Sequence, residues 1–297
     1  MLKQVQHDSL LVYAQKMKRS YNYLIPALLV LGACASKKAT TTTTTSAANT
    51  ASVTNGSTSI TNDGKIWASL WQQRAAEYRA LCFQAYNIAK QRVDEGVKKI
   101  STKPLAIVTD IDETLLDNSP YDAAQGLKNQ DYSDKTWKQW TDKALADTVP
   151  GAPAFFKYAA SKGITIYYIT NRNENERGAT LYNLQKYAMP NANDEHLFLK
   201  NGNSSKEERR QEVLKTHEIL LLCGDNLPDF DMLYDNHPTE ENRTAITQKL
   251  QKEFGSRYIV IPNPSYGDFE GALFQYNYKL SPAQKDSIIR AKVKADR

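Results

Sequence analysis

Apolar and polar positions divide the chain into alternating strand and helix segments. Short, nearly continuous apolar runs predict buried strands at residues 106–109, 163–169, 196–199, 219–222 and 258–261. Between these runs the spacing is helical, for example at residues 152–161 and 179–187. Because strands and helices alternate, we expect an α/β fold with a doubly wound, Rossmann-like parallel sheet. Ligands of such sheets bind at the carboxyl ends of the strands.

Upstream of the first strand, apolar residues recur at three- and four-residue steps from Lys65 to about Lys99. This spacing predicts one long amphipathic helix. We expect its aromatic side chains, such as Trp67 and Trp71, to pack against the rest of the domain or a partner subunit rather than bind a cofactor. Pro104 separates the predicted helix from the first strand.

The N-terminal region has the pattern of an export signal. A short apolar stretch at residues 24–31 is preceded by three basic residues, Lys16, Lys18 and Arg19. Such a stretch is too short to span a bilayer but suits the core of a signal peptide. Met17 is an alternative to Met1 as the true start.

The apolar stretch closes with Leu31-Gly-Ala-Cys34, which is similar to a bacterial lipobox. We therefore expect residues 1–34 to supply a lipoprotein signal peptide and a lipidated Cys34, which would anchor the protein to the outer membrane of the cell envelope, facing the periplasm or the surface. A secretory signal with a chance cysteine is the alternative.

Residues 35–63 are rich in Thr and Ser and predict a disordered tether, so the folded domain is expected at residues 64–297.

Composition allows a full hydrophobic core. The chain has 297 residues, of which 41% are hydrophobic and 24% charged, and its net charge is +5. We find no helix rich in Lys and Arg with interleaved aromatics, so a nucleic-acid polymer is not an expected partner.

Cys82 and Cys223 are the cysteines other than Cys34. We expect two separate thiols, although export would permit a disulfide.

Two acidic residues follow the first predicted strand, in the segment at residues 106–114. Past its last paired residue a strand curls, so Asp110 and Asp112 can both reach one crevice. One carboxylate can act as a nucleophile while the other transfers a proton, as phosphoryl transfer requires. A solvated turn is the alternative reading of an acidic pair beside a strand.

A second apolar run, at residues 218–223, also ends in acidic residues, Asp225 and Asp229. Two carboxylates about 4 to 6 Å apart repel by roughly 3 to 4 kcal/mol at an effective dielectric near 20. If the sheet gathers these residues with Asp110 and Asp112, a cation must offset the repulsion. Hard oxygen ligands without neighbouring Cys or His favour Mg²⁺, which we expect as the cofactor.

Polar residues that suit a phosphoryl group follow other predicted elements. Thr170, Asn171 and Arg172 come directly after the strand at residues 163–169. A phosphoryl site also needs a fixed cation opposite the metal. Lys206 is the candidate for this cation and Lys200 is the alternative. Polar residues after a strand are common, and the segment containing Lys206 also has the pattern of an ordinary helix start.

Together these segments resemble the haloacid dehalogenase (HAD) superfamily, and within it the class C nonspecific acid phosphatases typified by the lipoprotein e 5′-nucleotidase. The resemblance runs from about Trp67 to the C-terminal region. It covers the two parts of the class signature and the two middle motifs, at residues 110–121, 219–230, 170–172 and 204–209.

The resemblance implies a HAD-like core with a smaller helical cap. The core is expected from residues 101–114 and 151–280, and the helical part from residues 64–100 and 115–150. The family also suggests a homodimer, for which the long N-terminal helix is a candidate interface.

The resemblance further assigns roles to the polar residues. Asp110 is the expected nucleophile, which forms an aspartyl-phosphate. Asp112 is expected to protonate the leaving oxygen and then to deprotonate the attacking water. Thr170 and Lys206 are expected to hold the phosphoryl oxygens.

The same resemblance implies the metal ligands. Mg²⁺ is expected to bind Asp110, the backbone carbonyl of Asp112 and Asp225, with Asp229 nearby but outside the direct ligand set.

Substrate contacts are expected from polar and aromatic residues. Asn171 and Arg172 would contact the phosphate ester, and rings at Tyr121, Trp137 and Tyr266 would line the nucleoside site. Stacking on an aromatic ring is worth roughly 1 to 3 kcal/mol and tolerates any base. The alternative is that these rings fill a core.

The expected function is hydrolysis of phosphomonoesters, above all nucleoside monophosphates and related esters such as nicotinamide mononucleotide. Class members often carry a Trp shortly after the tyrosine, and residues 122–126 lack one, so the nucleotide preference is open. A phosphotransferase on the same fold and a non-catalytic surface lipoprotein that binds a ligand are the alternatives. Asp112 argues against a haloalkanoate dehalogenase, which has no need of a second aspartate.

Overall fold

Five parallel strands form the central sheet of the computed structural model, which describes residues 59–296. Their order across the sheet is β5 (Leu197–Phe198), β4 (Thr165–Ile169), β1 (Leu105–Thr109), β6 (Glu218–Gly224) and β7 (Tyr258–Val260). The chain moves outward from β1 through β4 to β5 and then returns to the other side of β1 with β6. The predicted doubly wound α/β sheet is confirmed, and its switch point lies between β1 and β6.

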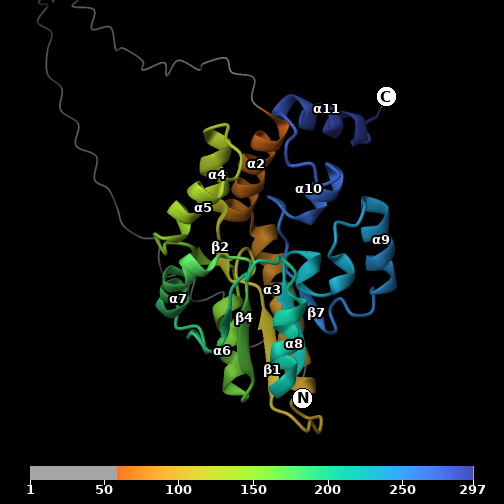
Figure 1. Cartoon of the computed structure of the whole chain (residues 1–297). Helices are drawn as coiled ribbons and strands as arrows, with labels where there is room; N and C mark the ends of the chain where they lie inside the picture. The colour runs from red at the N-terminus through yellow and green to blue at the C-terminus, as the bar shows by residue number, and fades with distance from the viewer. Residues whose placement is uncertain (1–58, 297) are drawn as a thin grey trace, which may run out of the picture. The chain divides into compact units, whose positions relative to one another are not determined.

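The helices form two groups (Figure 1). One group lies beside the sheet and its loops and contains α3 (Ala76–Gly96), α6 (Ala152–Ser161), α7 (Arg177–Lys186), α8 (Glu207–Thr216) and α9 (Glu240–Lys249). The other group lies in the upper part of Figure 1 and contains α2 (Ile60–Arg74), α4 (Ser119–Leu127), α5 (Asp134–Thr141), α10 (Asp268–Leu273) and α11 (Pro282–Lys292). Below α4 and α5, β2 (Leu116–Asp117) pairs with β3 (Asp147–Thr148) in a small antiparallel ribbon.

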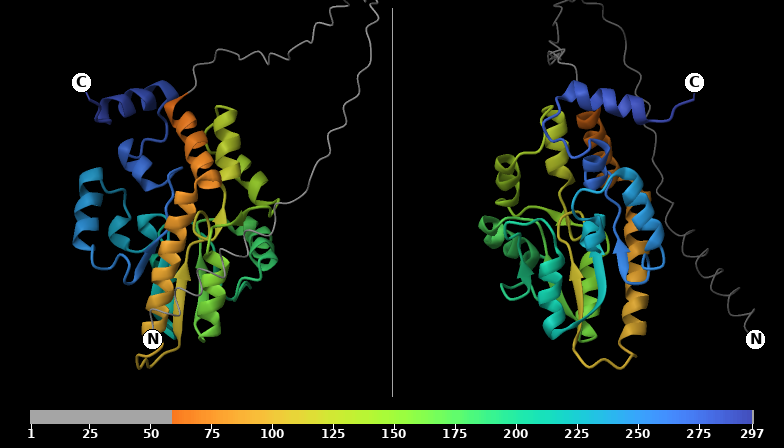
Figure 2. Two further views of the ribbon diagram at one scale, coloured as in Figure 1. Left: turned by 180° about the vertical axis from the view of Figure 1, so that it is seen from behind. Right: turned by 45° about the vertical axis from the view of Figure 1, so that its right-hand side comes forward.

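The upper group contains more of the chain than the predicted cap. Helices α4 and α5 fall within the predicted residues 115–150, but α10 and α11 come from the C-terminal end. The prediction also placed residues 64–100 in the helical part, whereas α3, which lies within that range, packs along the sheet (Figure 2). The cap is therefore assembled from distant stretches of sequence.

Alternate residues of the central strands pack on opposite faces of the sheet. One face, which α3 and α6 cover, buries Ile107, Ile166 and Leu221. The other face, which α8 covers, buries Val108, Tyr167 and Leu222. Because both faces are buried, these strands are apolar throughout, which explains why they were recognisable in the sequence.

The predicted single helix from Lys65 to about Lys99 is wrong. Ala75, with an extended ψ of 127°, divides it into α2 and α3. The two helices have different partners, since α2 packs against α4 and α11 whereas α3 packs against α6 and the sheet. Continuous helical spacing did not reveal that the two halves bury their apolar faces against different layers.

The predicted boundary of the tether is also wrong at its C-terminal end. Ser59 caps α2, which begins at Ile60, inside the range 35–63 assigned to the tether. The Ile60 N–H donates to Asp286 Oδ1 at 2.9 Å and thereby ties α2 to α11. The predicted signal peptide at residues 1–34, the lipidated Cys34, the alternative start Met17 and most of the tether lie outside the described residues.

The cysteines agree with the prediction of separate thiols. Cys82 and Cys223 are both buried and both free. Within residues 59–296, no helix is both long enough and apolar enough to cross a membrane.

Candidate active site

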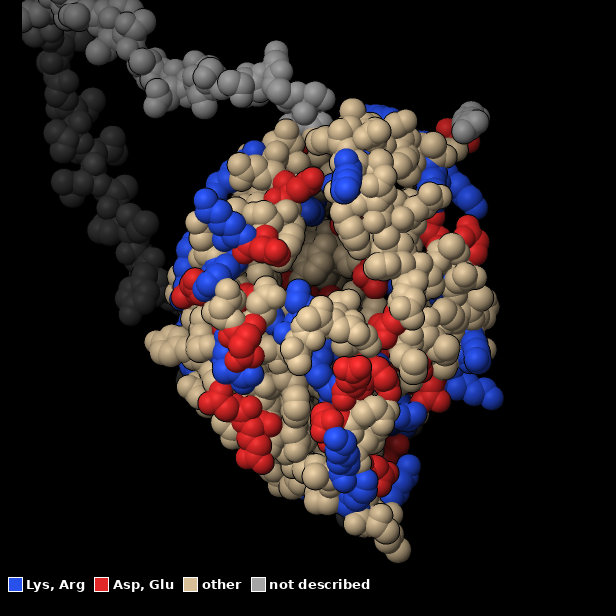
Figure 3. Space-filling model, in the orientation of Figure 1, with Lys and Arg blue, Asp and Glu red and all other residues tan. Residues whose placement is uncertain are grey.

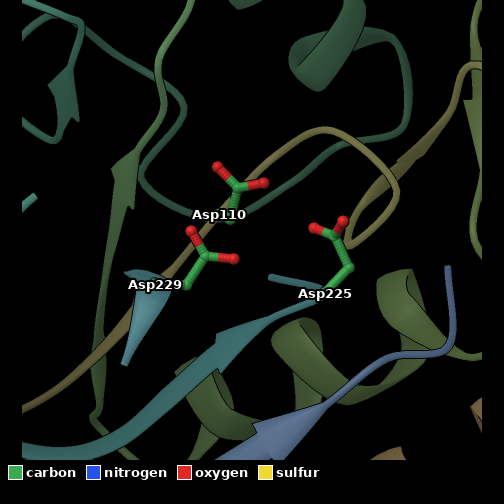
Figure 4. Close-up of side chains that lie close together, drawn as sticks. All are labelled: Asp110, Asp225 and Asp229. Carbon is green, nitrogen blue, oxygen red and sulfur yellow. The ribbon is translucent and has the colours of Figure 1, made fainter. Parts of the chain in front are cut away.

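Three carboxylates converge at the carboxyl edge of the sheet (Figure 4). Asp110 directly follows β1, Asp225 directly follows β6, and Asp229 lies in the short 3₁₀ helix η2 (Leu227–Asp229). Each offers an oxygen that lies within 4.8 Å of those of the other two. The switch point thus brings together acidic residues more than a hundred positions apart in the sequence.

Lys206 is the cation at this cluster. It lies just before α8, is 5% exposed, and its Nζ pairs with Asp110 and, at 2.6 Å, with Asp229 Oδ1. Lys200, the alternative, is not among the residues that line the active-site cavity, and its backbone N–H donates to the Arg172 carbonyl oxygen. The structure therefore brings Lys206 to the acidic cluster.

Burial and mutual repulsion raise the pKa values of Asp110 and Asp225. Burial raises the pKa of Asp110 to about 7 with help from Asp229 and Asp112, although Lys206 opposes the shift. Burial, followed by repulsion from Asp229 and Asp110, also holds the pKa of Asp225 well above its usual range. Burial alone would lower the pKa of Lys206, but the carboxylates of Asp110 and Asp229 outweigh it and raise that pKa.

The carboxylate oxygens of this cluster are suitable ligands for a hard divalent cation. Three carboxylates with one lysine leave a net negative charge, and oxygen ligands of this kind suit Mg²⁺ or a similar ion. Asp229, which was expected outside the direct ligand set, lies within the cluster. Its Oδ2 accepts the Asn226 N–H at 3.0 Å, which holds the carboxylate toward Asp110 and Lys206.

Asp112 lies beside the cluster, but its carboxylate is held by other residues. Arg172 donates to Asp112 Oδ1 through Nη2 at 2.7 Å and to both oxygens through Nε at 3.1 Å. Thr170 Oγ1 lies 3.5 Å from Asp112 Oδ2. Thr170 and Arg172 were expected to contact the substrate. In the structure they contact Asp112, whose side chain is 15% exposed.

A cavity of about 850 Å³ opens above the cluster, where Figure 3 shows the molecule hollowed between the cap helices and the sheet. Its polar lining includes Asp110, Asp112, Asn171, Arg172, Lys206, Asp225 and Asp229. The predicted rings of Tyr121, Trp137 and Tyr266 also line it, and those of Tyr121 and Trp137 meet edge to face with their centroids 5.1 Å apart. Their predicted contact with a nucleoside stays a prediction.

Several residues of the site were not predicted. Glu113 is fully buried at φ 55° and accepts a hydrogen bond from the Tyr266 hydroxyl. Arg209 donates to the Thr170 carbonyl at 2.6 Å and to Asn171 Oδ1 at 2.7 Å.

Asn263 donates to Asp225 Oδ2 at 2.8 Å. Glu113 and Arg209 lie inside recognised motifs, but the spacing of residues in a motif does not show which side chains point away from the cavity.

Tyr132 was also missed. It is 54% exposed and packs near Trp137 at the mouth of the cavity, 6.2 Å between ring centroids. A tyrosine in a polar stretch gives no periodic signal, so the sequence offered little to single it out.

The central strand of the parallel sheet ends in the Asp110 carboxylate, and a buried lysine and two further aspartates lie beside it. This arrangement is suited to phosphoryl transfer. A family model described as HAD superfamily, subfamily IIIB (acid phosphatase) matches residues 27–269. The chain belongs to this acid phosphatase family.

Solved structures of similar proteins agree with this assignment. The class C acid phosphatase from Bacillus anthracis is 40% identical, with a TM-score of 0.76, and the match covers 80% of this chain and 99% of that chain. A structure of the Bacillus anthracis class C acid phosphatase with tungstate bound matches at 40% identity with a TM-score of 0.75 and the same coverage.

Curated relatives are more distant. The stem 31 kDa glycoprotein of Glycine max is 25% identical over 162 residues, which is 52% of this chain and 57% of that protein. Acid phosphatase 1 of Solanum lycopersicum is 24% identical over 168 residues, 54% of this chain and 57% of that protein. The matched region thus spans little more than half the length of these relatives.

Gly224, the last residue of β6, allows Asp229 to approach the cluster. A Cβ at this position would lie 2.5 Å from Asp229 Cβ, which is too close for both to stay in place. We expect Gly224→Ala to displace Asp229 and to weaken binding of a divalent cation by about tenfold or more, as measured by isothermal titration calorimetry. The matched control is Gly178→Ala in α7, where a Cβ meets nothing within 4 Å. Unchanged affinity in folded Gly224→Ala would contradict the prediction.

Proposed function

We propose that this protein is a Mg²⁺-dependent acid phosphatase and 5′-nucleotidase that hydrolyses phosphomonoesters, among them nucleoside monophosphates and nicotinamide mononucleotide. The observation that carries the proposal is Asp110, a buried carboxylate that lies beside Lys206 and faces a cavity with room for a nucleotide. Membership of the acid phosphatase family supports it. So does the tungstate bound to the Bacillus anthracis enzyme, because tungstate is a tetrahedral oxyanion like phosphate.

In the proposed reaction Asp110 attacks phosphorus and the ester P–O bond breaks, which forms an aspartyl-phosphate. Asp112 donates a proton to the departing alcohol oxygen. Asp112 then takes a proton from a water that attacks phosphorus, and the bond from phosphorus to Asp110 breaks to release inorganic phosphate. Lys206 Nζ is placed to pair with a phosphoryl oxygen beside Asp110.

Asp110, Asp225 and Asp229 would hold the divalent ion, whose positive charge neutralises the phosphoryl oxygens when it is bound. The rings of Tyr121 and Trp137 would contact the leaving nucleoside. A phosphotransferase would use the same residues with an alcohol in place of water, so only the acceptor distinguishes the two activities.

We expect Asp110→Asn to lower phosphatase turnover by about 10³-fold or more, because an amide oxygen is a much weaker nucleophile than a carboxylate. Release of p-nitrophenolate from p-nitrophenyl phosphate measures this. We also expect EDTA to abolish turnover of the wild-type protein and excess Mg²⁺ to restore it.

The matched control for this substitution is Asp194→Asn, which changes an exposed aspartate outside the cavity. Its turnover should equal that of the wild type. Near wild-type rates in folded Asp110→Asn would remove Asp110 as the nucleophile. Tight binding of nucleotides by a wild-type protein that never turns them over would favour the non-catalytic lipoprotein instead.

The place of the protein in the cell envelope is part of the same proposal. A lipid on Cys34 would anchor the catalytic domain to the outer membrane through the Thr/Ser-rich segment. A homodimer is also expected, and the exposed Trp67 and Leu70 of α2 offer an apolar surface for it. A monomeric mass in sedimentation equilibrium would contradict the dimer.

We expect Cys34→Ser to move the protein from the membrane fraction to the soluble fraction of cells that express the full chain, because the acyl chains are lost. Cys82→Ser, at a buried free thiol, is the matched control and should stay in the membrane fraction. A wild-type protein without an acylated cysteine in mass spectrometry would argue for an ordinary secretory signal.

A further inference from the structure

Asn118 lies behind the proposed acid and base, Asp112. It is fully buried at the start of α4, and its Nδ2 donates to Asp112 Oδ1 at 2.8 Å. Its backbone N–H donates to Glu113 Oε1 at 2.8 Å. The backbone and the side chain of Asn118 are thus both held in place.

Trp140 determines which way the Asn118 amide points. Trp140 belongs to α5 in the cap, and its Nε1 lies 2.8 Å from Asn118 Oδ1. An indole N–H can only donate a hydrogen bond, so the atom facing it must be the amide oxygen. The amide NH₂ group must then face Asp112. A flipped amide would leave Trp140 without an acceptor and would set two oxygens against each other.

The contacts of Asp112 are unequal at its two oxygens. Oδ1 accepts from Asn118 at 2.8 Å and from Arg172 Nη2 at 2.7 Å. Oδ2 has longer contacts, 3.1 Å to Arg172 Nε and 3.5 Å to Thr170 Oγ1. Oδ1 is therefore occupied by the protein, and Oδ2 is the oxygen left to exchange a proton.

We propose that Asn118, oriented by Trp140 of the cap, is a positioning residue that holds Asp112 with Oδ2 directed at the leaving oxygen of the substrate. The inference rests on the proposed phosphatase function. Neither Asn118 nor Trp140 lines the cavity, so both act on the reaction through Asp112.

A comparison of leaving groups tests this role. An alkyl phosphate releases a strongly basic alkoxide and needs the proton from Asp112, whereas p-nitrophenolate leaves without one. We expect Asn118→Ala to lower kcat/KM about 100-fold for an alkyl phosphate but less than about 10-fold for p-nitrophenyl phosphate. A residue that only supports the fold would lower both by the same factor.

Trp140→Phe provides a second variant, which keeps an aromatic side chain but removes the indole N–H. We expect it to lower kcat/KM for the alkyl ester about 10-fold relative to p-nitrophenyl phosphate, because the Asn118 oxygen loses the hydrogen bond that fixes the amide and the amide then holds Asp112 less firmly. Trp67→Phe is the matched control at a side chain that is 71% exposed on α2, and the ratio between the two substrates should not change.

The outcomes separate the inference from the function on which it rests. A wild-type protein that hydrolyses neither ester overturns the proposed function. An active wild type with an unchanged substrate ratio in Trp140→Phe, or an equal loss for both esters in folded Asn118→Ala, overturns only the role of Asn118. If Asn118→Ala does not fold, the ratio in Trp140→Phe decides.

Discussion

Repulsion among three neighbouring carboxylates is the constraint on which the site depends. Asp110, Asp225 and Asp229 bring oxygens within 4.8 Å of one another, and Lys206 supplies a single compensating charge. Like charges at such distances cost several kcal/mol in a protein interior, so the arrangement persists only where the fold enforces it. The remaining negative charge makes the cluster suited to a divalent cation.

Strand pairing and hydrogen-bond donors hold the carboxylates in this arrangement. The Asp110 N–H donates to the Cys223 carbonyl at 2.9 Å and so continues the pairing of β1 with β6. Asp225 accepts from Thr114 Oγ1 at 3.1 Å and from Asn263 Nδ2 at 2.8 Å. Each carboxylate therefore has a fixed direction before any ligand arrives, which is the condition for electrostatic catalysis without reorganisation.

The cap has a different task, because it shapes the cavity above a floor that the sheet provides. Its rings come from α4, α5 and the loop before α10, and α4 packs against α2, which also contacts α11. Trp140 also connects the cap to the floor, since its contact with Asn118 reaches the Asp112 carboxylate. The cap and the floor of the cavity are thus linked through one layer of side chains.

The local sequence determined the strands, the acidic strand ends and the family. Apolar runs buried on both faces and carboxylates at their ends are properties of consecutive residues, so Asp110 and Asp225 could be singled out without coordinates, and Lys206 could be singled out from the motif at residues 204–209. The break of the long N-terminal helix at Ala75, the engagement of Arg172 with Asp112 and the buried turn at Glu113 were decided only by tertiary structure. The physical reason is that each depends on a partner distant in sequence, and one-dimensional spacing records which face of an element is apolar but not what it packs against.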